Sequence, residues 1–300
     1  MVSITKENFS IGQICESGQC FRLHRLEGSN REQKIKAEIR NRRSLTNEDG
    51  NQISDGKYAL TALGQYLEME QRQNQFFFDC TPEEFERVWR EYFDLEEDYG
   101  KIMDMIDPRD TYLLKAAAYG SGIRILRQDL WEMIISFIVS QQNNIRRIRK
   151  CIETLCQRYG EEKRLEDGRK YYIFPTPETL AKASLEELYA CNLGYRSKYI
   201  HKTAASVALG DIDLDAIRQM DYKEAMKELC KLTGVGEKVA NCICLFALHK
   251  TEAFPVDTHI QKVLREQYAD GFPFDRYAGY AGTLQQYIFY YDLKKGGIIC

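Results

Sequence analysis

The stretch KELCKLTGVGEKVANCICLFALHKTEAFPVDTHIQKV, residues Lys227–Val263, is the most informative part of this 300-residue chain. One predicted helix ends near Lys231, and Gly234 and Gly236 allow a tight turn because neither has a Cβ atom. A second helix follows, with apolar residues at i, i+4 and i+7 on one face. The backbone N–H groups at its start form an anion site that suits a phosphate. The pattern predicts a helix-hairpin-helix over residues 221–249, although a lone G-x-G also fits an ordinary αα-hairpin.

Two ionisable residues in this stretch are candidates for catalysis. Lys238 lies in the first turn of the second helix, where the positive end of the helix dipole disfavours a charged amine. A lysine with a lowered pKa can act as a nucleophile and form a Schiff base, whereas most lysines at helix starts are simply solvated. Asp257 is a predicted helix N-cap, and a carboxylate fixed there could also stabilise positive charge on a sugar. The two residues alone leave both interpretations open.

The first part of the chain lacks helical periodicity. Residues 9–80 contain short apolar or alternating runs separated by turn residues, a pattern typical of antiparallel strands, with room for a short helix. Strands are expected at residues 20–26, 34–39, 58–63, 65–69 and 75–80. The polar stretch between the second and third of these, residues 41–56, is expected to form turns or a mobile loop.

From Thr81 onward the pattern is helical. Thr81 is a predicted N-cap, Pro82 takes the first helical position and Glu84 completes a capping box. Helices are expected at residues 82–93, 109–119, 129–141, 144–159, 177–183, 185–191, 196–209, 221–231, 237–248, 258–268 and 278–292.

The sequence therefore predicts an α+β protein with two domains. The first, residues 1–95, is an antiparallel β domain with a connecting helix. The second, residues 96–300, is an all-α body that contains the hairpin (221–249) and the aspartate loop (254–260).

Composition and charge limit the classes of function. Lys and Arg number 42 and Asp and Glu 45, which gives a net charge of −3, so a polyanion must be bound by a local basic patch. A hydrophobic content of 44% excludes a disordered chain. The first residues do not resemble a secretory signal, and the apolar segments Trp131–Val139 and Val239–Leu248 are too short to span a bilayer. We expect no membrane association.

The ten cysteines show no metal-binding pattern. None stands in a C-x-x-C relation, which argues against a zinc or iron–sulfur site. Buried free thiols in a reducing compartment are expected. This places the protein in the cytoplasm, associated with the nucleoid, if the source is bacterial or archaeal, and in the nucleus if it is eukaryotic.

Six motifs, in a fixed order, give the chain a family resemblance. They are SGQCFR (Ser17–Arg22), SFIVSQQNNIRRI (Ser136–Ile148), NLGYRSKYI (Asn192–Ile200), LTGVGEKVANCICL (Leu232–Leu245), FPVDTHI (Phe254–Ile260) and YAGTLQQYIF (Tyr280–Phe289). Together they resemble the helix-hairpin-helix/Gly-Pro-Asp DNA glycosylases of base-excision repair, and in particular the 8-oxoguanine DNA glycosylase branch, over nearly the whole chain.

The resemblance implies a reaction and its catalytic residues. Lys238 matches the lysine that attacks the sugar C1′ of a flipped nucleotide, expels the base and holds the sugar as a Schiff base, after which β-elimination nicks the strand. Asp257 matches the essential aspartate of the family. Gly234 and Gly236 match the hairpin that binds DNA phosphate, and His259 matches a histidine near the phosphate, although it could also cap a helix or pack in the core.

The resemblance also implies a pocket for the damaged base. Gly18 would place its carbonyl against the N7 hydrogen of 8-oxoguanine, whereas N7 of guanine is itself an acceptor and would be repelled. Cys242 and Phe289 match the residues on either side of the flipped base, and Gln285 matches the residue that bonds its pairing edge. Core packing is the alternative for Cys242 and Phe289.

On the opposite strand, Tyr195 matches the aromatic wedge beside the vacated site. Arg147 and Arg196 match the arginines that read the orphan cytosine, although Arg146–Lys150 could equally be a solvated helix face. Gln142 stands where relatives often have asparagine, which puts strictness for cytosine in question.

Lys238 argues against the alkyl-base branch of the superfamily, and the presence of only Cys300 beyond Cys244 disfavours the endonuclease III branch. Alkyl-base glycosylases share the layout but lack the hairpin lysine, and the endonuclease III branch keeps the lysine but commonly carries a four-cysteine iron–sulfur cluster. A glycosylase for formamidopyrimidine or an alkylated purine, or a non-catalytic DNA-binding hairpin protein, is also considered. The expected partner is damaged double-stranded DNA, bound by a monomer without a metal cofactor, save a monovalent cation at the hairpin backbone.

Overall fold

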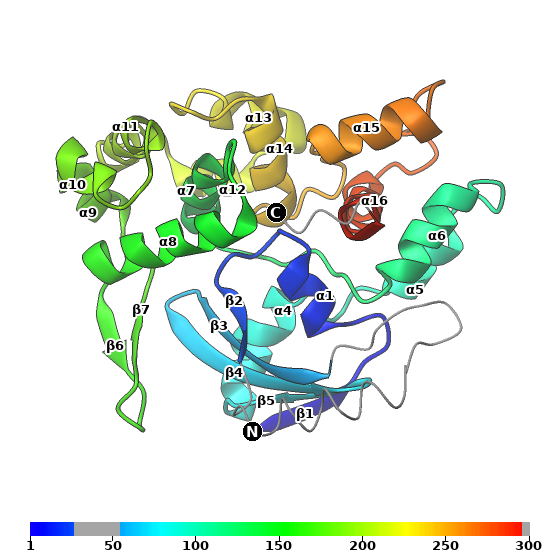
Figure 1. Ribbon diagram of the computed structural model, residues 1–300, viewed down its shortest axis with the longest axis horizontal. Helices are drawn as coiled ribbons and strands as arrows, with labels where there is room; N and C mark the ends of the chain where they lie inside the picture. The colour runs from blue at the N-terminus through cyan, green and yellow to red at the C-terminus, as the bar shows by residue number, and fades with distance from the viewer. Residues whose placement is uncertain (27–54, 296–300) are drawn as a thin grey trace.

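The computed structural model describes residues 1–26 and 55–295. The strand predicted at residues 34–39 and nearly all of the polar stretch 41–56 lie outside the described residues. Within them, the chain forms an antiparallel sheet followed by a helical body, which confirms the predicted fold class (Figure 1).

The sheet has five antiparallel strands in the order β1-β5-β4-β3-β2. Their bounds are β1 Val2–Thr5, β2 Leu23–Leu26, β3 Gly56–Ala62, β4 Gln65–Arg72 and β5 Gln75–Phe78. Leu63 and Gly64 join β3 to β4 with positive φ angles of 52° and 75°, the geometry of a two-residue hairpin turn. Strand β1 precedes the region in which strands were predicted, and it pairs with β5 at the edge of the sheet.

One face of the sheet is covered by helix α1 (Ile11–Glu16) and by the segment after Thr81. That segment is α3 (Pro82–Glu84), a π-helical turn η1 (Phe85–Trp89) and α4 (Arg90–Tyr92), where the sequence predicted one continuous helix. Thr81 accepts a hydrogen bond from the Glu84 backbone N–H at 3.1 Å, which confirms the predicted cap. These elements and the sheet share a hydrophobic cluster that runs from Phe9 to Leu95 and adds Leu126.

The body consists of short helices connected by tight loops. Their bounds are α5 Tyr99–Asp104, α6 Thr111–Tyr119, α7 Leu130–Ser140, α8 Ile145–Tyr159, α9 Pro177–Lys182, α10 Leu185–Tyr189, α11 Arg196–Ala208, α12 Leu214–Gln219, α13 Tyr222–Leu229, α14 Glu237–Phe246, α15 Thr258–Gln267 and α16 Ala281–Lys295. The six-residue helices α5 and α12 were not predicted.

The body is not entirely helical. A two-stranded hairpin, β6 (Glu162–Arg164) and β7 (Lys170–Tyr172), projects from it beside the sheet (Figure 1). Arg169 forms an ion pair with Glu68 of β4 at 2.5 Å, and the Tyr171 ring lies 5.6 Å from that of Tyr66. The hairpin therefore ties the body to the sheet.

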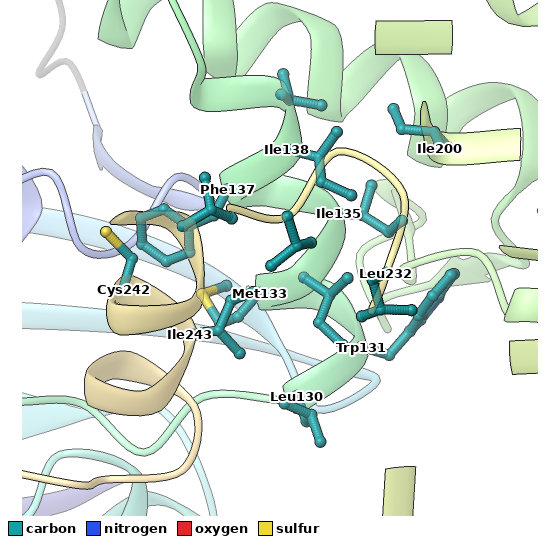
Figure 2. Packing of buried hydrophobic residues seen from close by; sticks show 14 of the residues in the cluster. Leu130, Trp131, Met133, Ile135, Phe137, Ile138, Ile200, Leu232, Cys242 and Ile243 are labelled. Carbon is teal, nitrogen blue, oxygen red and sulfur yellow. The ribbon is translucent and has the colours of Figure 1, made fainter. Parts of the chain in front are cut away.

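Helix α7 is the centre of the body. Every residue from Leu130 to Val139 is buried, and α8, α11 and α14 pack around it. Figure 2 shows this packing, with Cys242 of α14 at the edge of the drawn cluster and Phe137 between α7 and α14. Among the described helices, none is long and apolar enough to cross a membrane.

The last helix returns to the start of the body. Helix α16 packs against α6 and α15 in a second hydrophobic cluster, which includes Tyr99, Leu113, Ile260 and Tyr287. This arrangement brings the C-terminal helix alongside the loop that follows α1, and the contact between these two segments forms part of the candidate site.

Candidate active site

The hairpin turn between α13 and α14 needs glycine at one of its two glycine positions. Gly234 has φ +87°, and a Cβ atom there would lie 2.6 Å from the ring of Tyr199. Gly236 has an extended φ of −97° and no neighbour within 4 Å of an added Cβ. Only Gly234 therefore requires glycine for its conformation, whereas Gly236 caps α14 without a side chain and leaves its backbone exposed.

Lys238 and Asp257 both influence the pKa of the Cys242 thiol. Lys238 is exposed in the first turn of α14, and Cys242 lies buried one turn later. Burial raises the pKa of the Cys242 thiol, the charge and hydrogen bond of Lys238 oppose this rise, and the carboxylate of Asp257 adds to it. One thiol therefore senses both predicted catalytic groups, although the groups come from different helices.

Asp257 occupies the N-cap of α15, as predicted. Its Oδ1 accepts a hydrogen bond from the backbone N–H of Ile260 at 2.9 Å, which fixes the carboxylate at the entrance of the helix. No other described residue donates to Oδ2 of Asp257, and the side chain is only half-buried. The carboxylate is thus held in place with one oxygen still available to a ligand.

The predicted base pocket brings together the loop after α1 and the last helix. Gly18 has φ +75°, and a Cβ atom there would lie 3.5 Å from Cε1 of Phe289 and 3.9 Å from Cδ1 of Ile145. Gly18 therefore faces Phe289 directly. Ile145 was not predicted as a site residue, because an apolar residue in the first turn of a helix gives no signal beyond packing.

Gln285 is buried on the same helix, and its amide is already engaged. Its Nε2 donates to the carbonyl of Pro255 at 2.9 Å, and its Oε1 accepts from Nε2 of Gln286 at 3.2 Å. The first of these bonds joins α16 to the aspartate loop, only two residues before Asp257.

His259 connects the aspartate loop to Phe289 and to a residue that sequence reasoning missed. Its ring lies 5.6 Å from the Phe289 ring in an edge-on arrangement, and its Nδ1 lies 2.7 Å from Oδ2 of Asp292. Lys262 Nζ donates to the other oxygen of Asp292 at 2.8 Å. Asp292 lies three residues beyond the YAGTLQQYIF motif. It is 33 residues from His259 in the sequence, so no local pattern predicts that the two side chains pair.

The residues expected to contact the opposite strand lie around the start of α8 and α11. Gln142 is exposed with a positive φ of 46°, a conformation that asparagine adopts more readily than glutamine. Arg147 is exposed, and its Nη2 is 3.4 Å from the carbonyl of Asn192. The Tyr195 side chain is 43% exposed, with its ring 5.6 Å from that of Tyr199, which itself covers Gly234.

Arg196 is placed differently from the other opposite-strand residues. It is 4% exposed, stacks 4.6 Å from the centre of the Tyr195 ring, and donates to the carbonyls of Leu193, Gln141 and Gln142. These hydrogen bonds of the Arg196 guanidinium hold the turn that contains Gln142. They leave untested whether Arg196 also binds an orphan cytosine, and this role stays a prediction.

The described residues contain no group of three or more His, Cys, Asp or Glu side chains placed to hold a metal ion. The nine cysteines in that part of the chain are all unpaired, and eight of them are buried.

The hairpin turn, the aspartate at the N-cap of α15 and the contact between Gly18 and Phe289 match the layout expected of a helix-hairpin-helix protein of the base-excision repair class. Residues 135–271 match the family model described as HhH-GPD superfamily base excision DNA repair protein. Residues 1–134 match the model of the N-terminal domain of 8-oxoguanine DNA glycosylase. Within the superfamily, this chain belongs to the 8-oxoguanine DNA glycosylase family.

Relatives and solved structures agree with this assignment. The N-glycosylase/DNA lyase of Saccharomyces cerevisiae is 31% identical over 280 residues, which cover 89% of this chain and 70% of the yeast protein. The apo form of Clostridium acetobutylicum 8-oxoguanine glycosylase/lyase superposes with a TM-score of 0.82 at 34% identity, covering 97% of this chain and 96% of that one. The same enzyme bound to double-stranded DNA with cytosine opposite 8-oxoguanine gives 0.83 at 33% identity, with 99% of each chain covered.

Proposed function

We propose that this protein removes 8-oxoguanine from duplex DNA through a Schiff base on Lys238 and then cleaves the strand by β-elimination. The observation that carries the proposal is the carboxylate of Asp257 held at the N-cap of α15, with Lys238 exposed in the first turn of α14. It supplies a fixed anion and a candidate amine nucleophile. The family membership and the named activities of the yeast and Clostridium relatives support the same reaction.

In the proposed first step, Nζ of Lys238, as the neutral amine, attacks C1′ as the bond from C1′ to the base breaks. The base leaves with the electron pair of that bond and takes up the proton that Nζ loses. Positive charge develops on the sugar as this bond breaks, and the carboxylate of Asp257 stabilises it. The sugar ring then opens to give the Schiff base. Loss of a 2′ proton and of the 3′ phosphate completes the β-elimination.

In the proposed recognition step, the carbonyl of Gly18 accepts the N7 hydrogen that 8-oxoguanine has and guanine lacks. Phe289 faces Gly18 across the pocket, and Cys242 lies beside Lys238. Entry of the base into this pocket requires flipping out of the duplex, which costs a few kcal/mol. Gln285 could bond the pairing edge of the base from the position that its bond to Pro255 fixes.

We propose duplex DNA as the partner of a monomeric enzyme, and a monovalent cation as an additional ligand of the hairpin turn. The carbonyls of Leu232, Thr233 and Gly234 each accept one hydrogen bond within the protein. Since a carbonyl has two lone pairs, each could also coordinate a cation. Such an ion would stabilise the turn that faces the DNA phosphate, and the chemical steps above do not depend on it.

Borohydride trapping tests the proposed reaction. Incubated with a duplex that contains 8-oxoguanine opposite cytosine, the protein should form a covalent complex that borohydride makes permanent. The Lys238→Gln variant should form none. Lys231→Gln removes a charge from the same hairpin and is the matched control, because Lys231 pairs with Glu228 and should leave trapping intact. Trapping that survives Lys238→Gln would exclude this lysine as the nucleophile.

Substrate class is tested with the same protein on other duplexes. Release of formamidopyrimidine or an alkylated purine at a higher rate than 8-oxoguanine would assign the enzyme to another lesion. Duplex binding without release of any base would identify a non-catalytic hairpin protein.

A further inference from the structure

The loop that carries Gly18 is held by a fully buried glutamine. Gln19 has no exposed surface, and its Nε2 donates to Oγ of Ser17 at 3.0 Å and to the carbonyl of Arg124 at 2.9 Å. Its Oε1 accepts from the backbone N–H of Leu126 at 3.0 Å. Both amide hydrogens and the amide oxygen are therefore used, and they bind the Gly18 loop to the segment between α6 and α7.

A second buried glutamine, Gln128, links Gln19 to α14, the helix that carries Lys238. Gln128 is 5% exposed, and its Nε2 donates to the backbone carbonyl of Gln19 at 2.8 Å. The same Nε2 lies 3.4 Å from the carbonyl of Phe246, to which the backbone N–H of Gln128 also donates at 3.2 Å. Phe246 is the last residue of α14, and Lys238 lies in its first turn.

Helix α14 is a rigid element between Phe246 and Lys238. At about 1.5 Å per residue, Lys238 lies about 12 Å along the axis of α14 from Phe246. Eight residues of α14, from Val239 to Phe246, are buried, so the helix cannot shift without moving the core around α7. Phe246 is therefore a fixed reference point for the Gly18 loop, at a constant distance from Lys238.

Gly18 has a particular need for such support. Glycine populates positive and negative φ values with similar ease, so its own backbone does little to hold the φ of +75° seen here. The peptide of Gly18 must be fixed by its neighbours if its carbonyl is to distinguish one hydrogen on a purine. Ser17 and Gln19, on either side, are both fully buried and hydrogen-bonded to each other.

We propose that Gln19 and Gln128 are positioning residues for recognition of the damaged base, an inference that rests on the proposed function. They set the place of the Gly18 carbonyl relative to α14, and therefore relative to Lys238. The selection of 8-oxoguanine then depends on two amides that do not touch the base. Chemistry at an abasic site, which has no base to recognise, does not depend on them.

The test compares two reactions of the same variant. Gln19→Met and Gln128→Met keep the side-chain length and remove the amide. Each is assayed under single-turnover conditions on a duplex with 8-oxoguanine opposite cytosine and on a duplex with an abasic site. We expect base excision to fall by about tenfold to a hundredfold, the effect of a small displacement of a recognition group. Abasic-site cleavage is expected to stay within about threefold of wild type.

Gln71→Met is the matched control. Gln71 is also a buried amide, which accepts from the Ile11 backbone N–H at 2.9 Å and donates to the Gln73 carbonyl at 3.1 Å, but it lies in β4, away from Gly18. Both reactions should persist in this variant. If Gln19→Met does not fold, Gln19→Glu serves instead, since it keeps the acceptor for Leu126 and removes both donors.

Two results would overturn the inference. In the first, Gln19→Met excises 8-oxoguanine at the wild-type rate. In the second, excision and abasic-site cleavage fall together, which indicates a general structural role. Failure of the proposed function itself has a different signature, because the wild-type protein would then release no 8-oxoguanine.

Discussion

The last two helices share a hydrogen-bonded pair: Nδ1 of His259 on α15 lies 2.7 Å from Oδ2 of Asp292 on α16. Lys262 donates to the other oxygen of the same carboxylate. Because the His259 ring also meets Phe289, the pair couples the aspartate loop to the wall of the base pocket.

Replacement of Asp292 by asparagine should destabilise the protein in a pH-dependent way. Burial disfavours the carboxylate, but hydrogen bonds from Lys262 and His259 outweigh it and hold the pKa of Asp292 below its ordinary value of 3.8. A lowered carboxyl pKa stabilises the fold above the ordinary value, and this contribution is lost as the pH falls through the folded-state pKa. We expect Asp292→Asn to lose about 1–2 kcal/mol of unfolding free energy at pH 7, and less below pH of about 4.

Denaturant titrations between pH 3 and pH 7 measure this difference. Asp270→Asn is the control, because Asp270 is exposed at the end of α15, and its loss should leave stability unchanged at every pH. A constant deficit for Asp292→Asn across the range would show that the carboxylate is not held charged by its partners.

Alanine at the two hairpin glycines should give opposite results. Gly234→Ala places a Cβ atom against Tyr199 and strains a positive φ, so we expect a loss of about 1–3 kcal/mol of unfolding free energy. Gly236→Ala meets neither obstacle and should change stability by less than about 0.5 kcal/mol. Thermal and denaturant unfolding of the pair measure both, and equal losses would contradict the different geometry of the two positions.

Glu132 should make the protein less stable as the pH rises through neutrality. Burial raises the pKa of Glu132 to about 7, although Arg22 opposes the rise. A carboxyl with a raised folded-state pKa favours folding fully below its ordinary value of 4.5 and loses this contribution as the pH rises through about 7. We expect Glu132→Gln to gain about 3 kcal/mol relative to wild type between pH 5 and pH 8.

Glu153→Gln is the matched comparison for this measurement. Glu153 is half-buried, with 34% of its side chain exposed, and hydrogen bonds and charges from His24 and Arg22 outweigh desolvation and lower the pKa of its carboxyl. It should therefore lose stability at pH 8, where Glu132→Gln gains it. A loss for both variants at pH 8 would indicate that Glu132 is charged and paired in the folded protein.

Preference for cytosine opposite the lesion should depend on Arg147. Arg147 is exposed, with its guanidinium 3.4 Å from the carbonyl of Asn192, and an arginine bonded to base acceptors provides about 1–3 kcal/mol of discrimination. We expect Arg147→Ala to reduce the ratio of excision rates opposite cytosine and opposite adenine by about tenfold. Arg146→Ala removes a neighbouring exposed charge and should preserve the ratio. Equal excision rates opposite all four bases in the wild type would refute recognition of cytosine by Arg147. The glutamine at position 142, where relatives often have asparagine, would then be the residue to test.

Local signals in the sequence were sufficient for most of the fold. Caps such as Thr81 and Asp257 place the helix starts correctly, because a side chain that accepts from the first turn acts locally. Helix α12 escaped prediction although Asp213 caps it, since six residues show too little periodicity. The strands of the β6–β7 hairpin are three residues long and mostly charged, so they carry no alternating pattern.

The site was less predictable, because burial and partners depend on the whole fold. The motifs named Lys238 and Asp257, and in the fold both influence the pKa of the buried Cys242 thiol. The burial of Arg196 by three backbone carbonyls could not be inferred from a charged residue at the start of a helix. The hydrogen bond between Gln128 and Gln19 could not be predicted from the sequence either, since neither residue belongs to a periodic pattern.

The contact between Gly18 and Phe289 determines when the two sides of the predicted base pocket can meet during synthesis. These residues lie near opposite ends of the chain, so their contact forms only when the first and the last described helices are both in place. The helix-hairpin-helix is synthesised before α16. The predicted base pocket can therefore be completed only after the last helix has been made.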